Sequence, residues 1–249
     1  MRVLLLGGTA EARALAARLY PEVDVISSLA GRVPDPALPA GPVRIGGFGG
    51  EAGLRDWLRA HDVDCVIDAT HPFAATITAH AASVCAELGM PYVVLSRPAW
   101  TTDNVITAGS NGEAAKIVAK HDYSRIFLTT GRSGVSAFAD SDALFVIRVV
   151  TPPEPDTLPR RHRLVLSRGP YRYEDEYALM HEFRIEAMVT KNSGGAMTQP
   201  KLDAAAALGV AVVMIERPPL PSGVHTVSTV DAALDWLTGI PGLPVIPVR

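Results

Sequence analysis

The chain has 249 residues, of which 48% are hydrophobic and 20% are charged, and its formal net charge is −3. This apolar fraction supports one large α/β domain or two small ones. Because there is no basic excess, the charge excludes nucleic acids and anionic membranes as partners held by overall charge, so an anionic small molecule would need a local cluster of Arg and Lys.

The two cysteines, Cys65 and Cys85, lie in apolar runs, which indicates reduced core thiols rather than a disulfide or a zinc site. The apolar run at the N-terminus is too short for a signal peptide, and no stretch approaches the roughly 20 apolar residues that cross a bilayer. We therefore expect a soluble, cytoplasmic protein without a metal.

Short apolar runs alternate with helix-like runs, which is typical of βα units around parallel sheets. In the first half, strands are predicted at residues 3–6, 23–26, 43–45, 65–67 and 92–95. Helical spacing predicts helices at residues 10–20, 51–59 and 74–88, with Gly89 ending the last of them.

The second half follows Ser96-Arg97-Pro98 and repeats this alternation of strand-like and helix-like runs. Its predicted strands are residues 105–107, 126–128, 144–149, 163–166, 187–189 and 210–215. Its predicted helices are residues 113–120, 135–138, 174–181, 197–208 and 230–237, and the proline cluster at 151–155 predicts a surface loop. We predict an α/β protein of two Rossmann-like doubly wound parallel-sheet lobes, residues 1–98 and 99–249, with a cleft between them.

The turns after the predicted strands contain most of the unusual residues. In open parallel sheets, ligands bind beyond the carboxyl ends of the strands. In the second lobe these turns repeatedly include a cation, namely Arg132, Arg168 and Lys191. Loop carbonyls alone could explain each cation, but their recurrence favours a shared wall that binds carboxylates.

Between the first strand and the first helix lies the segment Gly7-Gly8-Thr9-Ala10-Glu11-Ala12. Glycine lets a pyrophosphate approach the backbone, and the N-terminus of a helix favours an anion. Gly7 and Ala12 match the dinucleotide fingerprint, whereas Thr9 replaces its middle glycine. The segment therefore predicts a dinucleotide turn, with a tight turn without a ligand as the alternative. Thr9 could both cap the helix and bind a phosphate.

The second strand ends without the acidic residue that usually binds the ribose of NAD. Ser28 stands there instead, with Arg32 close behind. Hydroxyl and guanidinium groups suit a 2′-phosphate, which an acid would repel. This pattern favours NADPH, unless Arg32 is an ordinary surface arginine.

His71 follows the fourth strand at a carboxyl edge, which makes it a candidate functional residue. The chain has no phosphate loop, no Tyr-x-x-x-Lys pair, no nucleophile elbow and no zinc pattern. A methyltransferase that uses the glycine turn is disfavoured because strand two lacks a terminal acid.

Blocks of residues throughout the chain match those of one enzyme family. They are Leu6-Gly7-Gly8-Thr9-x-Glu11-Ala12-Arg13, Ser28-Leu29-Ala30-Gly31-Arg32, Gly46-Gly47-Phe48-Gly49-Gly50, Asp68-Ala69-Thr70-His71-Pro72-Phe73-Ala74, Thr130-Gly131-Arg132, Ser167-Arg168-Gly169-Pro170, Thr190-Lys191-Asn192-Ser193-Gly194-Gly195, Lys201-Leu202 and Ile215-Glu216-Arg217-Pro218. On these blocks the chain resembles the precorrin-6A reductases of cobalamin biosynthesis, including the cobalt-precorrin-6A enzymes.

The resemblance implies that the first lobe binds NADPH, whose hydride, together with a proton, saturates one double bond of a precorrin macrocycle. The substrate carries many carboxylates, which the cationic turns of the second lobe could bind. Transient contacts with neighbouring pathway enzymes are also expected. The alternatives are a reductase of another acidic metabolite and a nucleotide-sensing module without catalysis.

These expectations assign roles to particular residues. The cofactor is expected to contact Gly7, Gly8, Thr9, Glu11, Ala12, Ser28, Arg32, Gly46, Gly47, Phe48, Thr70 and His71. The substrate is expected to contact Arg132, Arg168, Lys191, Asn192, Ser193, Gly194 and Lys201. His71 and Lys191 are the two candidates for the proton donor.

Overall fold

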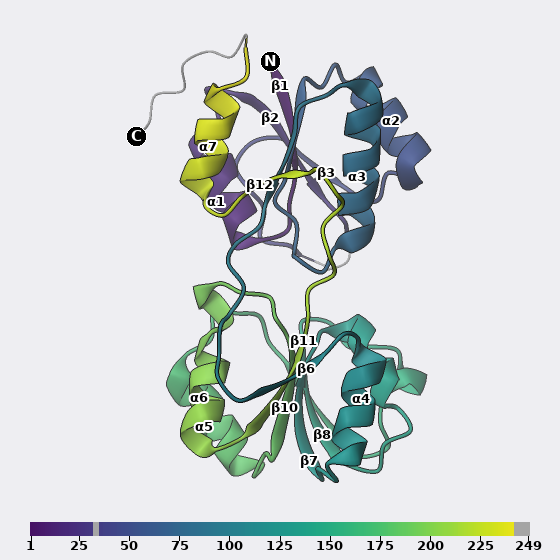
Figure 1. The fold of residues 1–249 in the computed structure, drawn as a ribbon, viewed down its shortest axis with the longest axis vertical. Helices are drawn as coiled ribbons and strands as arrows, with labels where there is room; N and C mark the ends of the chain where they lie inside the picture. Colours follow the sequence, from purple (N-terminus) through teal and green to yellow (C-terminus); the bar gives the residue numbers. More distant parts are fainter. Residues whose placement is uncertain (32–34, 242–249) are drawn as a thin grey trace. The chain divides into compact units, whose positions relative to one another are not determined.

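The computed structural model describes residues 1–31 and 35–241, and it divides the chain into two compact units (Figure 1). The first unit comprises residues 1–98 and the chain from Pro218 onwards, and the second comprises residues 99–217. The chain thus passes between the units twice. The boundary after residue 98 coincides with the first passage, but the prediction that residues 99–249 form one lobe is wrong, because the C-terminal segment returns to the first unit.

The first unit is a parallel sheet in the order β12-β5-β4-β1-β2-β3. Its strands are β1 (Arg2–Leu6), β2 (Asp24–Leu29), β3 (Val43–Ile45), β4 (Cys65–Asp68), β5 (Tyr92–Leu95) and β12 (His225–Val227). Its helices are α1 (Ala10–Leu19), α2 (Gly50–Ala60), α3 (Ala75–Leu88) and α7 (Val230–Thr238). Figure 1 shows α1 and α7 on one face of the sheet and α2 and α3 on the other.

The continuous apolar run of β1 has a partner on each face of the sheet. Val3 and Leu5 pack in the cluster that α1 and α7 cover, whereas Leu4 and Leu6 pack in the cluster under α2 and α3. A strand buried on both faces needs apolar residues at every position, because successive side chains point to opposite faces. Cys65 and Cys85 are free and buried in these clusters, as predicted, and burial raises the pKa of both thiols to about 12.

The returning segment accounts for the misplaced boundary. Strand β12, which the sequence did not predict, pairs in parallel with β5, with His225 opposite Val93. Helix α7 then packs its buried Leu234 and Leu237 in the cluster that also contains residues of α1. Because β12 has only three residues, two of them exposed, it lacks the apolar run that identifies a strand.

The second unit is also a parallel sheet, in the order β6-β11-β10-β7-β8-β9. Its strands are β6 (Val105–Ala108), β7 (Arg125–Thr129), β8 (Leu144–Val149), β9 (His162–Leu166), β10 (Ala187–Lys191) and β11 (Ala211–Ile215). Its helices are α4 (Asn111–Lys120), α5 (Tyr173–Glu182), α6 (Pro200–Leu208) and the 3-10 turns η1 (Arg132–Phe138), η2 (Pro155–Thr157) and η3 (Ala196–Thr198). Helices α5 and α6 cover one face and α4 the other (Figure 1).

Two predicted helices differ in the structure. The one expected at residues 135–138 is the 3-10 turn η1, and the one expected at 197–208 divides into η3 and α6. Helix α6 begins at Pro200 because proline, which lacks an N–H and has a helical φ, suits a first helical position.

Both sheets have the same strand order around their centres. Starting from β3 and from β9, the strands follow the Rossmann order 3-2-1-4-5-6, with β1 and β7 as first strands. The sixth strand comes from the chain's end in the first unit, and from the segment before β7 in the second. The predicted fold of two Rossmann-like lobes is confirmed. In this fold, ligands bind at the carboxyl edge near the first and fourth strands.

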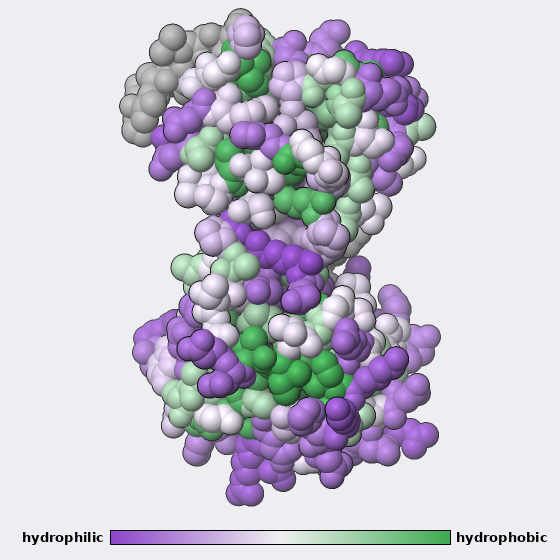
Figure 2. All heavy atoms as spheres, viewed as in Figure 1, coloured by the Kyte–Doolittle hydropathy of each residue, from purple (hydrophilic) through white to green (hydrophobic). Residues whose placement is uncertain are grey.

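The surface of each unit is mostly hydrophilic at its periphery on the face that Figure 2 draws. In the part of the chain that the structure describes, no helix is long and apolar enough to span a membrane.

Candidate cofactor and substrate sites

The turn after β1 has the form of a dinucleotide-binding turn. Gly8 is exposed and adopts φ +111°, and a Cβ added there would meet no atom within 4 Å. A Cβ at Gly7 would instead lie 3.4 Å from Ala12 Cβ, so this glycine permits close packing of the strand and the helix. The turn therefore offers open space in front of the N-terminus of α1, where a phosphate fits.

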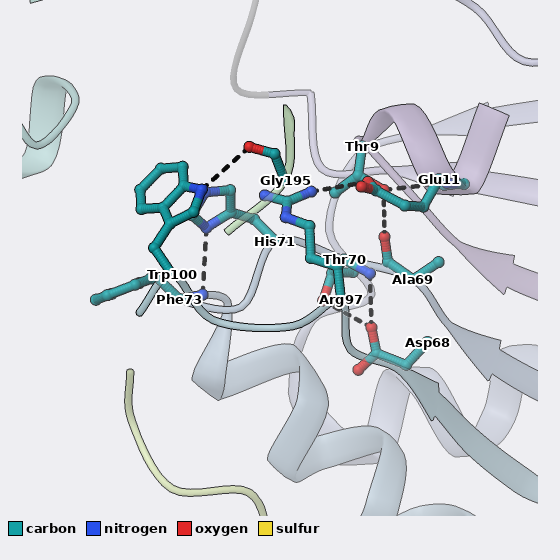
Figure 3. A network of polar contacts seen from close by, with 11 residues as sticks. Thr9, Glu11, Asp68, Ala69, Thr70, His71, Phe73, Arg97, Trp100 and Gly195 are labelled. Carbon is teal, nitrogen blue, oxygen red and sulfur yellow. Dashed lines mark hydrogen bonds and ion pairs between the residues drawn. The ribbon is translucent and has the colours of Figure 1, made fainter. Parts of the chain in front are cut away.

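Thr9 caps helix α1, as predicted. Its Oγ1 accepts a hydrogen bond of 3.1 Å from the N–H of Ala12 and donates one of 2.7 Å to the carbonyl of Ala69 (Figure 3). Because the single hydroxyl proton is already donated to Ala69, the phosphate contact predicted for this hydroxyl must come from the backbone N–H groups of the turn.

Glu11, in the first turn of α1, forms an ion pair of 2.7 Å with Arg97, which follows β5 (Figure 3). The sequence marked the Ser96-Arg97-Pro98 turn but gave Arg97 no role. This cation lies beside the N-terminus of α1, and both favour an anion at the turn. Glu11, a predicted cofactor residue, therefore has Arg97 as an ionic partner.

Ser28 ends β2 beside a cation that the sequence did not single out. In the parallel pair of β2 and β3, Ser28 lies opposite Arg44, and Arg44 Nη1 donates to Ser28 Oγ at 2.9 Å. Arg32, the predicted partner, lies outside the described residues. The sequence did not indicate a role for Arg44, because this residue stands inside a predicted strand and its nearness to Ser28 depends on strand register.

The guanidinium of Arg44 also organises the turn after β3. It donates to the carbonyls of Gly46 at 2.9 Å and Gly47 at 3.1 Å, and its central carbon lies 3.8 Å from the centre of the Phe48 ring. Partial burial lowers the pKa of Arg44. Among the described residues, these bonds use three of the five guanidinium donors, which leaves two for an anion.

The turn after β4 is built on a buried carboxylate. Asp68 Oδ1 accepts from the N–H and the hydroxyl of Thr70, and Oδ2 accepts from Thr78 at 2.7 Å and from Tyr92 at 3.1 Å. The adjacent His71 is exposed, and its Nδ1 accepts from the N–H of Phe73 at 3.2 Å. A neutral His71 therefore has its proton on Nε2.

The predicted cationic residues of the second unit share one edge of its sheet. Arg132 and Arg168 lie just past the ends of β7 and β9, and Lys191 ends β10. Since all these strands are parallel, the three residues stand at the same carboxyl edge. Strands β7 and β10 are neighbours, so Arg132 and Lys191 lie at the ends of adjacent strands, whereas β8 lies between β7 and the strand that precedes Arg168.

Two predicted substrate residues have other contacts. The side chain of Asn192 pairs with the backbone of Trp100, at 2.8 Å and 3.2 Å. Lys201 is 5% exposed, and its Nζ lies 5.0 Å from the centre of the Trp100 ring. Burial and the nearby Arg148 lower the pKa of Lys201 to about 7, against the attraction of Glu176. This burial argues against direct binding of the substrate by Lys201.

The first unit thus offers an open glycine turn, a helix N-terminus and two cations, which fits a dinucleotide phosphate. The second offers cations and a glycine-containing turn, which fits carboxylates. Within residues 1–31 and 35–241, no group of three His, Cys, Asp or Glu side chains could hold a metal.

Comparisons with known proteins agree on one family. The family described as "Precorrin-6x reductase CbiJ/CobK" matches residues 2–238. The precorrin-6A reductase of Mycobacterium tuberculosis is 67% identical over 240 residues, which cover 96% of this chain and 98% of that protein. The one from Rhodococcus erythropolis is 53% identical, covering 95% and 97%. A solved structure of "CobK precorrin-6A reductase" is 36% identical, with a TM-score of 0.89 and 96% of each chain covered.

Proposed function

Because the chain belongs to the precorrin-6x reductase family, we propose that it reduces one double bond of precorrin-6A with NADPH, as a cytoplasmic enzyme of cobalamin biosynthesis. The observation that carries this proposal is the match over residues 2–238, together with 67% identity to a precorrin-6A reductase. A family of reductases implies a nicotinamide cofactor, and bound NADPH would supply the hydride.

The first unit holds the cofactor in this proposal. The backbone N–H groups at Gly8 and the start of α1 bind the pyrophosphate, supported by the cation Arg97. Ser28 and Arg44 bind the 2′-phosphate, with Gly46, Gly47 and Phe48 completing that end of the site. Thr70, held by Asp68, and His71 line the same carboxyl edge.

The second unit holds the macrocycle. Arg132, Arg168 and Lys191 neutralise its acetate and propionate groups, and the backbone N–H of Gly194 adds a donor. The backbone N–H of Ser193 donates to the carbonyl of Lys191 at 2.7 Å and shapes the turn. The remaining requirement is a proton. His71 offers Nε2–H from the first unit and Lys191 its ammonium from the second, and both remain candidates for the donor.

The direct test is an anaerobic assay of NADPH absorbance with precorrin-6A and with its cobalt complex. We expect NADPH consumption with precorrin-6A and formation of a product that carries two more hydrogens. Consumption with another acidic metabolite alone would indicate a different reductase. Nucleotide binding without turnover of either macrocycle would indicate a sensing module.

Cofactor choice provides the next prediction. We expect Arg44→Ala to weaken binding of NADPH and of 2′,5′-ADP about tenfold to a hundredfold, because a charge-assisted bond contributes roughly 1.5–3 kcal/mol. Binding of NADH and 5′-AMP, measured by calorimetry, stays nearly unchanged. If Arg32→Ala has this effect and Arg44→Ala does not, the phosphate is bound by Arg32. Equal losses of affinity for all four ligands would mean that Arg44 stabilises the fold and does not bind the 2′-phosphate.

The cationic wall makes a separate prediction. We expect Lys191→Ala and Arg132→Ala each to raise the KM for precorrin-6A about tenfold or more, since each removes a charge-assisted bond to a carboxylate. The Kd for NADPH is unchanged in both, and the exposed Lys120→Ala at the end of α4 is the control. If Lys191 donates the proton, the single-turnover rate of Lys191→Ala at saturating substrate also falls and its pH profile changes. Normal binding by both variants would place the macrocycle elsewhere.

A further inference from the structure

The side chain of Asn192 forms a two-point pair with a main-chain segment far away in sequence. Its Oδ1 accepts from the N–H of Trp100 at 2.8 Å, and its Nδ2 donates to the carbonyl of Trp100 at 3.2 Å. An amide paired in this way reproduces the bonds of one residue in a β-ladder. The pair uses the oxygen and one N–H of the amide, so these groups of Asn192 are bonded to the backbone of Trp100 and hold the two segments together.

Residues 191–195, which we call the β10 turn, are bonded at further points. The indole Nε1–H of Trp100 donates to the carbonyl of Gly195 at 3.2 Å (Figure 3), and Arg217 Nε donates to the carbonyl of Asn192 at 2.7 Å. Trp100 therefore holds the middle and the far end of this turn. Arg217, which follows the turn in sequence whereas Trp100 precedes it, bonds to the middle of the turn.

Trp100 and Arg217 lie next to the two points where the chain passes between the units. The chain enters the second unit at residue 99 and leaves it after residue 217. Trp100 is thus the second residue after the entry, and Arg217 is the last before the exit. Both connecting segments are bonded to one residue, Asn192, which immediately follows Lys191.

Trp100 is itself held in place by the fold. Its ring packs against the core cluster that contains Met180 and Leu202, and the buried Nζ of Lys201 lies 5.0 Å from the ring centre. A partner anchored in this way can transmit rigidity to the turn. Flexibility is otherwise expected there, because Gly194 and Gly195 have positive φ values of 66° and 84°, and glycine loses the most conformational freedom on ordering.

We propose that Asn192 is a positioning residue, which clamps the β10 turn to both connecting segments and so holds its backbone donors and Lys191 ready for the substrate's carboxylates. This inference rests on the proposed function, in which the turn binds the macrocycle. A site ordered before binding loses less conformational freedom on association, so the clamp strengthens substrate binding. Cofactor binding, assigned to the first unit, does not depend on it.

The test compares Asn192→Ala, Asn192→Asp and Trp100→Phe in the full-length enzyme, with Gln199→Ala as the nearby control. Asn192→Asp keeps the shape but turns an oxygen toward the Trp100 carbonyl. Of the hydrogen bonds to the β10 turn, Trp100→Phe removes only the one to Gly195. Hydrogen exchange of the β10 turn is measured without substrate, and KM, kcat and the Kd for NADPH are measured with it.

We expect exchange in the turn to accelerate at least about tenfold in both Asn192 variants and less in Trp100→Phe. Asn192→Ala loses two hydrogen bonds, and Asn192→Asp loses one and places a carboxylate oxygen against the Trp100 carbonyl, whereas Trp100→Phe loses one bond only. KM for precorrin-6A rises in the same order. The Kd for NADPH stays within about twofold of the wild type, since the first unit is untouched. Saturating substrate restores slow exchange, and Gln199→Ala behaves like the wild type.

Unchanged exchange in Asn192→Ala overturns the clamp, whatever the enzyme's substrate. Wild-type exchange combined with a raised KM makes Asn192 a direct substrate ligand and also overturns it. If exchange accelerates but neither Asn192→Ala nor Lys191→Ala alters KM, the clamp exists and the turn is not the substrate site. That result refutes the assignment of the substrate and, with it, the positioning role.

Discussion

We expect Gly8→Val to abolish NADPH binding while the circular dichroism spectrum stays normal. The Cβ added at Gly8 meets no protein atom within 4 Å, so the valine side chain would project into the space in front of α1 that the pyrophosphate requires. The residue also has φ +111°, which strains any L-amino acid by about 1–3 kcal/mol. Calorimetry with NADPH measures the loss of binding.

Strain and obstruction must be separated in this experiment. Gly89→Ala is the matched control, because Gly89 has φ +61°, nothing lies within 4 Å of its added Cβ, and it ends α3 at the opposite edge of the same sheet. The control should lose stability and keep NADPH binding. Tight binding retained by Gly8→Val would move the cofactor away from this turn. The turn after β7, which has the same place in the second sheet, would then be the next site to test.

We expect the largest effect of pH on stability to come from Lys201. Its ammonium is buried below Trp100 and faces Arg148 on β8 and Glu176 on α5, which form an ion pair with each other. The pKa of Lys201 falls to about 7 in the folded protein. An unfolded lysine titrates near 10.4. Between these values the unfolded chain binds one more proton than the folded one, so the free energy of unfolding rises with pH.

Lys201→Met removes this dependence. Relative to the variant, the wild type should gain roughly 3–4 kcal/mol of unfolding free energy between pH 7 and pH 10, because the slope reaches about 1.4 kcal/mol per pH unit between the two pKa values and is smaller near each of them. At pH 7 the variant should be at least as stable as the wild type, since methionine fills the space without a buried charge. Denaturant unfolding at several pH values measures the difference.

The exposed Lys116 on α4 provides the control, because Lys116→Met should differ from the wild type by an amount that does not vary in this way. A constant difference between Lys201→Met and the wild type across the range would mean that the folded protein keeps Lys201 charged.

Local patterns in the sequence determined most of the elements and the turns that lie at the carboxyl edge of each sheet. The continuous apolar runs at residues 3–6 and 65–67 predicted strands, and the structure has β1 and β4 there, buried along most of their length. Gly7-Gly8-Thr9 predicted a capped helix start, and the structure has the cap. Such features depend on residues a few positions apart, and they recur in any protein with the same alternation.

The tertiary structure decided which distant polar groups meet. Ser28 meets Arg44 through strand register, Asn192 meets Trp100 across 92 positions of sequence, and β12 joins the first sheet from the end of the chain. Lys201, which a helical pattern places at the surface as readily as in the core, is buried by Trp100 from a connecting segment. Periodicity encodes which face of an element is apolar, but partners far apart in sequence depend on strand order and register, which are settled only when the whole sheet packs.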